Sequence, residues 1–128
     1  MKEGIILLGH GSRREEANQE VKRLAEMIQE DLDQKKEEVP CRVAFLSFGS
    51  PDLEEAVDSL VQNGVERVIV TPYFLVTGNH IKKDIPEELE RIQQKHSGTK
   101  MILASHLGPH PDLIGIVQQR INEARELI

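Results

Sequence analysis

Residues 65–86 read VERVIVTPYFLVTGNHIKKDIP, and they carry the strongest signal for the architecture of this chain. Its first six residues form a largely apolar run, which is typical of a strand buried on both faces. The run leads into a turn that carries Gly78, His80 and two lysines, and a helical pattern follows. Open α/β sheets place their ligands at such turns, beyond the carboxyl ends of the strands. The stretch therefore predicts a buried parallel strand with a functional turn after it.

A second turn of the same build stands near the start of the chain. The apolar residues 4–8 lead into His10, which lies between two glycines. Each turn also carries two adjacent basic residues, and these are Arg13, Arg14, Lys82 and Lys83. If the two strands are parallel neighbours, His10 and His80 emerge at the same edge of the sheet. We therefore expect the two histidines to face one cleft.

The remaining pattern alternates strands with helices. Four apolar runs are typical of strands, and they span residues 4–8, 41–48, 65–71 and 101–104. Each is followed by a segment with apolar residues at three- and four-residue spacing, as in an amphipathic helix. This order predicts an α/β fold: a single three-layer domain over residues 1–128, with a four-stranded parallel sheet flanked by helices.

Local signals predict where the helices begin. Ser50 is a good N-cap for the second helix, with Pro51 in the first helical position. Asp84 is expected to cap the third helix, and Glu87 three residues later would complete a capping box. His110 is expected to cap the last helix, next to Pro111.

Composition narrows the function classes. A net charge of −6 argues against a nucleic-acid partner, which would require a basic surface. No apolar stretch is long enough to cross a bilayer, so no membrane partner is expected. The single cysteine, Cys41, cannot form an internal disulfide and is expected to be a packed thiol. These features together predict a soluble, cytoplasmic protein.

Two imidazoles in one cleft suit two kinds of chemistry. Neutral histidine binds borderline metals such as Fe²⁺, Co²⁺, Ni²⁺ or Zn²⁺, and its pKa lets it accept protons near neutral pH. Two ligands leave coordination positions open, unlike the four of a structural zinc site, so a metal here would be transferable. The basic residues at both turns would attract a polyanionic ligand. The other histidines, His96, His106 and His110, are interpreted as structural.

Three motifs together resemble the class II chelatases, and above all their short CbiX type. They are Gly9-His10-Gly11-Ser12-Arg13, the Pro72-Tyr73-Phe74-Leu75 stretch with Gly78-Asn79-His80 and Asp84-Ile85-Pro86, and Leu107-Gly108-Pro109-His110-Pro111. The resemblance spans nearly the whole chain. It implies an enzyme that inserts a divalent metal into sirohydrochlorin, a tetrapyrrole with many carboxylate side chains.

The resemblance also implies roles for residues. His10 and His80 match the family's paired histidines, which hold the metal and take protons from the pyrrole nitrogens. A second group is expected to bind the tetrapyrrole, and its members are Arg13, Arg14, Lys82, Lys83 and Ser12. The metal is a substrate, with Co²⁺ favoured over Fe²⁺ or Ni²⁺, and no tightly bound cofactor is expected. A homodimer would complete the cleft, and the favoured pathway is cobalamin synthesis.

One position departs from the family pattern. Many relatives carry an acidic residue shortly after the Phe-Leu of the second strand, where this chain has Ser47. The departure bears on metal preference. Glu54 and Glu55 are the candidates to replace the missing carboxylate.

Other functions remain open from the sequence. Iron or nickel insertion would serve siroheme or coenzyme F430 synthesis, and a carrier of metal or tetrapyrrole would bind without turnover. A phosphoryl-transfer enzyme with His10 as nucleophile would use the N–H groups of the first turn, but Gly9 stands where such enzymes need arginine. A hydrolase based on Ser12 lacks the nucleophile-elbow pattern.

Overall fold

The computed structural model describes residues 2–128, apart from the side chain of His80. The elements in chain order are β1 (Glu3–Gly9), α1 (Glu15–Gln34), β2 (Cys41–Phe45), α2 (Leu53–Gln62), β3 (Arg67–Pro72), α3 (Asn79–Lys95), β4 (Lys100–Leu103) and α4 (Asp112–Arg125). None of these helices combines the length and the apolar run that crossing a bilayer requires.

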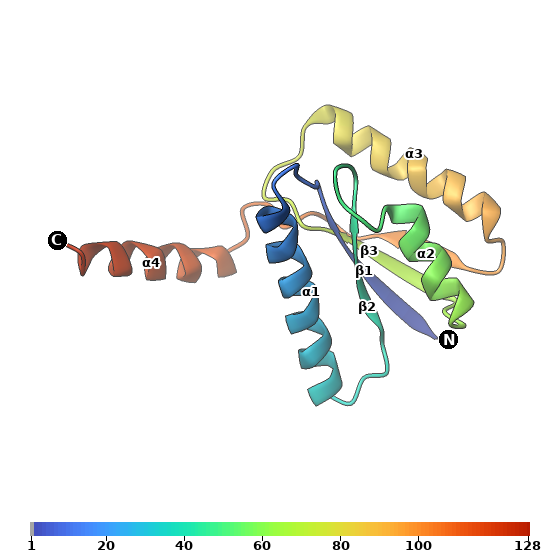
Figure 1. The fold of residues 1–128 in the computed structure, drawn as a ribbon, viewed down its shortest axis with the longest axis horizontal. Coiled ribbons are helices and arrows are strands. Elements are labelled where there is room, and N and C mark those ends of the chain that lie inside the picture. The colour runs from blue at the N-terminus through green and yellow to red at the C-terminus, as the bar shows by residue number, and fades with distance from the viewer. Residues whose placement is uncertain (1) are drawn as a thin grey trace.

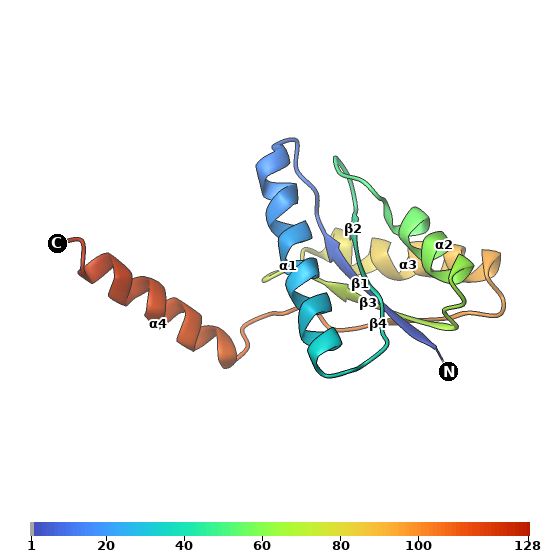
Figure 2. The ribbon, with the colours of Figure 1, turned by 60° about the horizontal axis from the view of Figure 1, so that its bottom comes forward.

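The four strands form one parallel sheet in the order β2-β1-β3-β4 (Figures 1 and 2). The predicted fold class is therefore confirmed. β1 and β3 are direct neighbours, with Leu8 in register with Pro72, so the carboxyl ends of the two strands lie at one edge. The strand predicted over residues 41–48 ends at Phe45, because the following residues leave the sheet to contact the turn after β1.

Helices cover both faces of the sheet, as the views in Figures 1 and 2 agree. α1 packs on β1 and β2, where Leu7, Ala25 and Cys41 are buried. The thiol of Cys41 is packed as predicted, and burial raises its pKa. α2 and α3 pack on the other face over the larger core, whose fully buried members include Leu8 and Val70.

α4 extends away from the rest of the molecule (Figures 1 and 2). The sequence predicts an apolar face for this helix, and that face is exposed: Ile114 is 59% exposed, Val117 55% and Ile121 44%. None of its residues is buried. This helix therefore presents an apolar face that the described residues do not cover.

The start of α2 differs from the prediction. The helix begins at Leu53 and is capped by Asp52, so the prediction of Ser50 as N-cap and Pro51 as first helical residue is wrong. Asp52 accepts a hydrogen bond from the Glu55 N–H at 2.8 Å, and Glu55 accepts one from the Asp52 N–H at 3.0 Å. This capping box satisfies two helix-end donors at once, which explains why it prevails over a serine.

The start of α3 also differs. The helix begins at Asn79, more than one turn before Asp84, so the predicted capping box of Asp84 and Glu87 is wrong. Pro86 lies inside the helix, where proline removes a hydrogen bond and usually marks a first turn. Packing explains the longer helix, since Ile81 contacts the core from the additional turn.

Candidate functional site

The turns after β1 and β2 are joined by backbone hydrogen bonds. The Leu46 N–H donates to the Gly9 carbonyl at 3.0 Å, and the Ser47 N–H donates to the His10 carbonyl at 3.1 Å. Gly11 has φ of 88°, and a Cβ at this position would lie 1.5 Å from the Ser47 carbonyl oxygen. Glycine is therefore required here both for the backbone conformation and for the close approach.

Asn18 lies near the start of α1, and its side chain bonds to the same two loops. Its side chain is buried, accepts from the Ser12 N–H, and donates to the carbonyls of Ser12 and Phe48, each at 2.9 Å. No local pattern in the sequence points to this residue. A buried amide that satisfies three backbone groups of two turns fixes the position of His10 between them.

The ring of His10 rests on a buried aromatic ring. The centroids of His10 and Phe74 are 3.9 Å apart, with 31° between the ring planes. Phe74 follows β3 and is 3% exposed, whereas His10 is exposed. The backbone beside Phe74 is held by the Tyr73 N–H, which donates to the Leu8 carbonyl at 2.8 Å. The imidazole is thus oriented by the neighbouring strand and remains accessible.

His10 lies at a cleft of about 940 Å³. The cleft is bounded by the turns after β1 and β2, the start of α2 and one side of α3. Apolar groups such as Phe45 and Ile85 line it together with Ser47. Cavities of this size and mixed lining are typical of small-molecule sites.

The wall that α3 contributes to the cleft is acidic. Asp84, Glu87 and Glu88 line it, together with Arg91. The Arg91 Nη2 atom lies 2.6 Å from a carboxylate oxygen of Glu88. This wall is not apparent from the sequence, because Asp84 resembles a helix cap there. A helix read from residue 79 would have placed Asp84, Glu88 and Arg91 on one face by their spacing.

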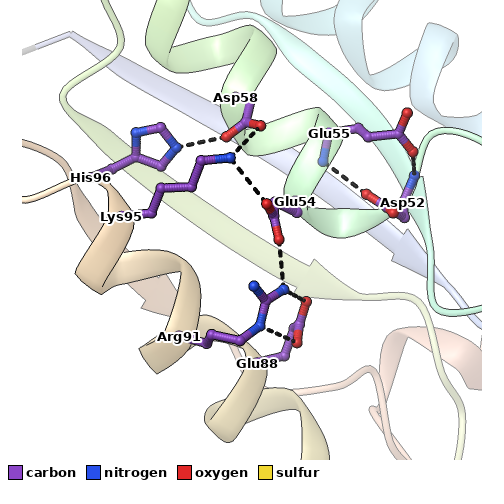
Figure 3. A network of polar contacts seen from close by, with 8 residues as sticks. All are labelled: Asp52, Glu54, Glu55, Asp58, Glu88, Arg91, Lys95 and His96. Atoms are coloured by element: carbon purple, nitrogen blue, oxygen red, sulfur yellow. Dashed lines mark hydrogen bonds and ion pairs between the residues drawn. The ribbon is translucent and has the colours of Figure 1, made fainter.

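A network of ion pairs holds that wall against α2 (Figure 3). Glu54 lies 2.6 Å from Arg91 and 3.0 Å from Lys95, and Asp58 lies 2.9 Å from Lys95 and 2.7 Å from His96. Hydrogen bonds from Arg91 and Lys95 lower the pKa of Glu54, and the hydrogen bond from Lys95 is the main cause that lowers the pKa of Asp58. His96 is therefore structural, as predicted, although its partner is Asp58.

The two candidates for the missing carboxylate have other tasks. Glu54 belongs to the network above, and Glu55 completes the capping box of α2 by accepting from the Asp52 N–H. Among the described residues that line the cleft, the carboxylates instead come from α3 and from Asp52. Ser47 faces the same cleft from the turn after β2.

The predicted basic residues occupy different surroundings. The Arg13 guanidinium lies 4.7 Å from the centroid of Phe48, which lines the cleft. Arg14 is exposed, and the Ser12 hydroxyl accepts from its N–H at 3.0 Å. Arg13 therefore stands at the cleft rim, and Ser12 stabilises the turn beside it.

The lysines after β3 are separated from each other. Lys83 is exposed and lies 4.0 Å from Glu87. Lys82 lines a second cavity, between α3 and the end of β4. His80 is the second residue of α3, and its side chain lies outside the described residues, so its pairing with His10 stays a prediction.

The arrangement can bind a cation and accept protons. An exposed imidazole and several carboxylates line the same cleft, and both kinds of group are metal ligands and bases. Among the described side chains, no three histidine, cysteine, aspartate or glutamate residues gather closely enough to hold a metal ion.

Comparison with known proteins identifies relatives along nearly the whole chain. A family model described as CbiX matches residues 4–124. The sirohydrochlorin cobaltochelatase of Sulfurisphaera tokodaii is 30% identical over 94% of this chain and 92% of its own length. The chloroplastic sirohydrochlorin ferrochelatase of Arabidopsis thaliana is 34% identical over 93% of this chain and 51% of its own length.

A solved structure is also similar to this chain over nearly its whole length. The structure of SirB from Bacillus subtilis with Fe³⁺ superposes with a TM-score of 0.85 at 28% identity, over 97% of this chain and 48% of that chain. The present chain therefore spans about half the length of several relatives that it matches.

Proposed function

The chain belongs to the CbiX family, and from this we propose that it is a sirohydrochlorin chelatase, which inserts a divalent metal into the tetrapyrrole. The observation that carries the proposal is His10, an accessible imidazole that rests on Phe74 and lines the cleft. The relatives matched along most of the chain are sirohydrochlorin chelatases that use cobalt or iron. The predicted reaction class thus agrees with the residues at the cleft.

The proposed chemistry follows from the proton balance. Insertion of M²⁺ forms bonds to the pyrrole nitrogens and releases two N–H protons. His10 and His80 would ligate the incoming metal and accept these protons. The negative charge of the carboxylates on the α3 wall would attract the incoming dication. The same charge would stabilise the protons that leave the pyrrole nitrogens. They supply negative charge in a cleft where Ser47 replaces the acidic residue of many relatives.

We propose that the tetrapyrrole is held by its carboxylates at the rim. Arg13 lies beside Phe48 at the cleft and can form a bidentate ion pair with a carboxylate. Arg14, Lys82 and Lys83 would add positive charge at the same edge. The Ser12 hydroxyl accepts an N–H and can still donate its own proton to a ligand.

Cobalt is our proposed metal, with cobalamin synthesis as the pathway. The support is the Sulfurisphaera tokodaii cobaltochelatase, which matches over 92% of its own length, whereas the Arabidopsis thaliana ferrochelatase matches over 51%. Imidazole accepts Fe²⁺, Co²⁺ and Ni²⁺ alike, so iron for siroheme and nickel for coenzyme F430 are the alternatives to be tested. The metal is a substrate, and we propose no tightly bound cofactor.

We further propose that the chain acts as a homodimer. α4 exposes an apolar face that the described part of the chain does not bury. On the sheet face where α1 covers β1 and β2, the paired residues Ile69 and Ile102 of β3 and β4 are half-buried. A second copy would cover both surfaces, and two copies together match the length of the longer relatives.

The cytoplasm is the proposed compartment. The single cysteine is buried and unpaired, which suits a reducing environment.

The test is anaerobic insertion of metal into sirohydrochlorin, followed by absorbance and corrected for the rate without protein. Co²⁺, Fe²⁺ and Ni²⁺ are compared with wild type, His10→Ala and His80→Ala. We expect acceleration by the wild type, fastest with Co²⁺, and a loss of about 100-fold or more in either variant. His110→Ala, which removes an exposed imidazole outside the cleft, is the control.

The other outcomes separate the alternatives. Binding of sirohydrochlorin without acceleration by any metal would identify a carrier. An absence of binding would refute the proposed substrate, and hydrolysis of a phosphate ester would then test the phosphoryl-transfer alternative.

A further inference from the structure

A second cavity, of about 340 Å³, lies beside the cleft at the carboxyl ends of β3 and β4. We name it the β4 pocket. Its apolar part includes Ile81 and Ile85, and both residues also line the cleft. The first turns of α3 therefore separate two cavities that share a wall. A ligand larger than the cleft can reach the β4 pocket across these turns.

The polar lining of the β4 pocket consists of hydrogen-bond donors. Thr77, Lys82, Ser105 and His106 come from the turn after β3, the start of α3 and the loop after β4. Their side chains make no hydrogen bond or ion pair with any described residue. Lys83 differs, because Glu87 lies 4.0 Å from its ammonium group.

This lining has the chemistry of a carboxylate site. An ammonium group, two hydroxyls and an imidazole can all donate to the two oxygens of a carboxylate. Acidic residues line the cleft on the other side of α3, whereas the β4 pocket is lined by neutral and basic side chains. The apolar part of the pocket fits the methylene stem of a side chain that ends in a carboxylate.

We propose that the β4 pocket binds one carboxylate-bearing side chain of the tetrapyrrole while the macrocycle occupies the cleft. Lys82 and His106 would bind the carboxylate, and Thr77 and Ser105 would complete its hydrogen bonds. This inference rests on the proposed function, and it gives Lys82 a specific task that Lys83 does not share. It also gives His106 a binding role in place of the structural role expected from the sequence.

The experiment is a titration of metal-free sirohydrochlorin into the full chain, followed by absorbance. We expect Lys82→Met to raise Kd about tenfold, because a charged hydrogen bond is lost. Ser105→Ala and His106→Ala should raise Kd by roughly threefold each, and the double variant Lys82→Met/Ser105→Ala by less than the product of the two. Lys100→Met, which makes the same charge change at the exposed amino end of β4, is the control and should stay within about twofold.

Two results would overturn the inference in different ways. If Lys83→Met weakens binding as much as Lys82→Met, the lysines act by charge alone and the β4 pocket is not a subsite. If the wild-type chain does not bind sirohydrochlorin, the proposed function fails and the inference fails with it.

Discussion

At the scale of single residues, the position of His10 depends on residues that carry no acid, base or metal-binding group. Gly11 lets the turn after β1 approach the turn after β2, and Asn18 bonds to both turns. His10 lies between these two contacts, and its ring rests on Phe74. The orientation of one imidazole thus results from residues on three separate segments, and substitution at any of them should move it.

The close approach at Gly11 can be tested directly. Gly11→Ala places a Cβ against the Ser47 carbonyl at φ of 88°, so we expect a loss of about 1–3 kcal/mol in the free energy of unfolding. Urea unfolding measures the loss. Gly98→Ala is the matched control, since a Cβ there meets nothing within 4 Å, and it should change stability by less than about 0.5 kcal/mol. Equal effects of the two substitutions would contradict the steric argument.

Asn18 gives a second prediction at this scale. Asn18→Ala leaves three backbone groups of the two turns without their partner, so we expect a loss of about 2–3 kcal/mol in stability. We also expect slower metal insertion at saturating substrate, because His10 loses its fixed position. Gln19→Ala, an exposed amide on the next position of α1, should leave both quantities unchanged. If the rate stays at the wild-type value in Asn18→Ala, the amide does not position the histidine.

At the scale of elements, α3 determines the charge of the cleft, because it carries the acidic wall. α2 holds it through Glu54 and Asp58, whose partners are Arg91, Lys95 and His96 (Figure 3). These pairs are partly exposed, so each is modest and screened by salt. Their main effect is on the position of α3 relative to the sheet.

The network predicts a pH dependence of stability. The pKa values of Glu54 and Asp58 are lowered in the folded chain from ordinary values of 4.5 and 3.8. Their stabilising contribution is therefore complete above those ordinary values, and it is lost as the pH falls through the lowered ones. We expect the urea midpoint to fall between about pH 5 and pH 2, and to fall less steeply in Asp58→Asn. If the urea midpoint of Asp58→Asn falls as steeply with pH as that of the wild type, Asp58 does not contribute. The control is Asp31→Asn, which removes an exposed ion pair on α1 and should keep the wild-type slope.

The same helix marks the limit of what the sequence can predict. The strands, their parallel arrangement and the place of His10 can be predicted from apolar runs and glycine turns, which are local signals. The start of α3 cannot be predicted in this way. Asp84 and Pro86 resemble a helix start, but the packing of Ile81 extends the helix beyond them. The acidic wall cannot be predicted from the sequence for this reason, since the residues that share its face follow from where the helix begins. Asn18 gives no local signal either, because its bond to the Phe48 carbonyl joins segments 30 residues apart in the sequence.

At the scale of the whole molecule, α4 is notable because the described residues leave its apolar face uncovered. We expect Val117→Glu to convert a dimer to a monomer, because it places a charge on the exposed apolar face. Light scattering after size-exclusion chromatography measures the mass, and circular dichroism checks that the α/β body is folded. Gln119→Glu, which adds the same charge on the opposite side of α4, should remain a dimer. A wild-type chain that is monomeric at all concentrations would refute the homodimer.

The burial of Cys41 has a practical consequence for work on this molecule. The thiol lies beneath α1, and its raised pKa leaves little thiolate at neutral pH. A thiol reagent should therefore react only when α1 opens from the sheet, so that the labelling rate reports the opening equilibrium. Since the chain has one cysteine, the readout comes from a single known position without any engineered label. A bound tetrapyrrole that stabilises the closed form would slow the labelling, which provides an assay for ligands that requires neither colour nor turnover.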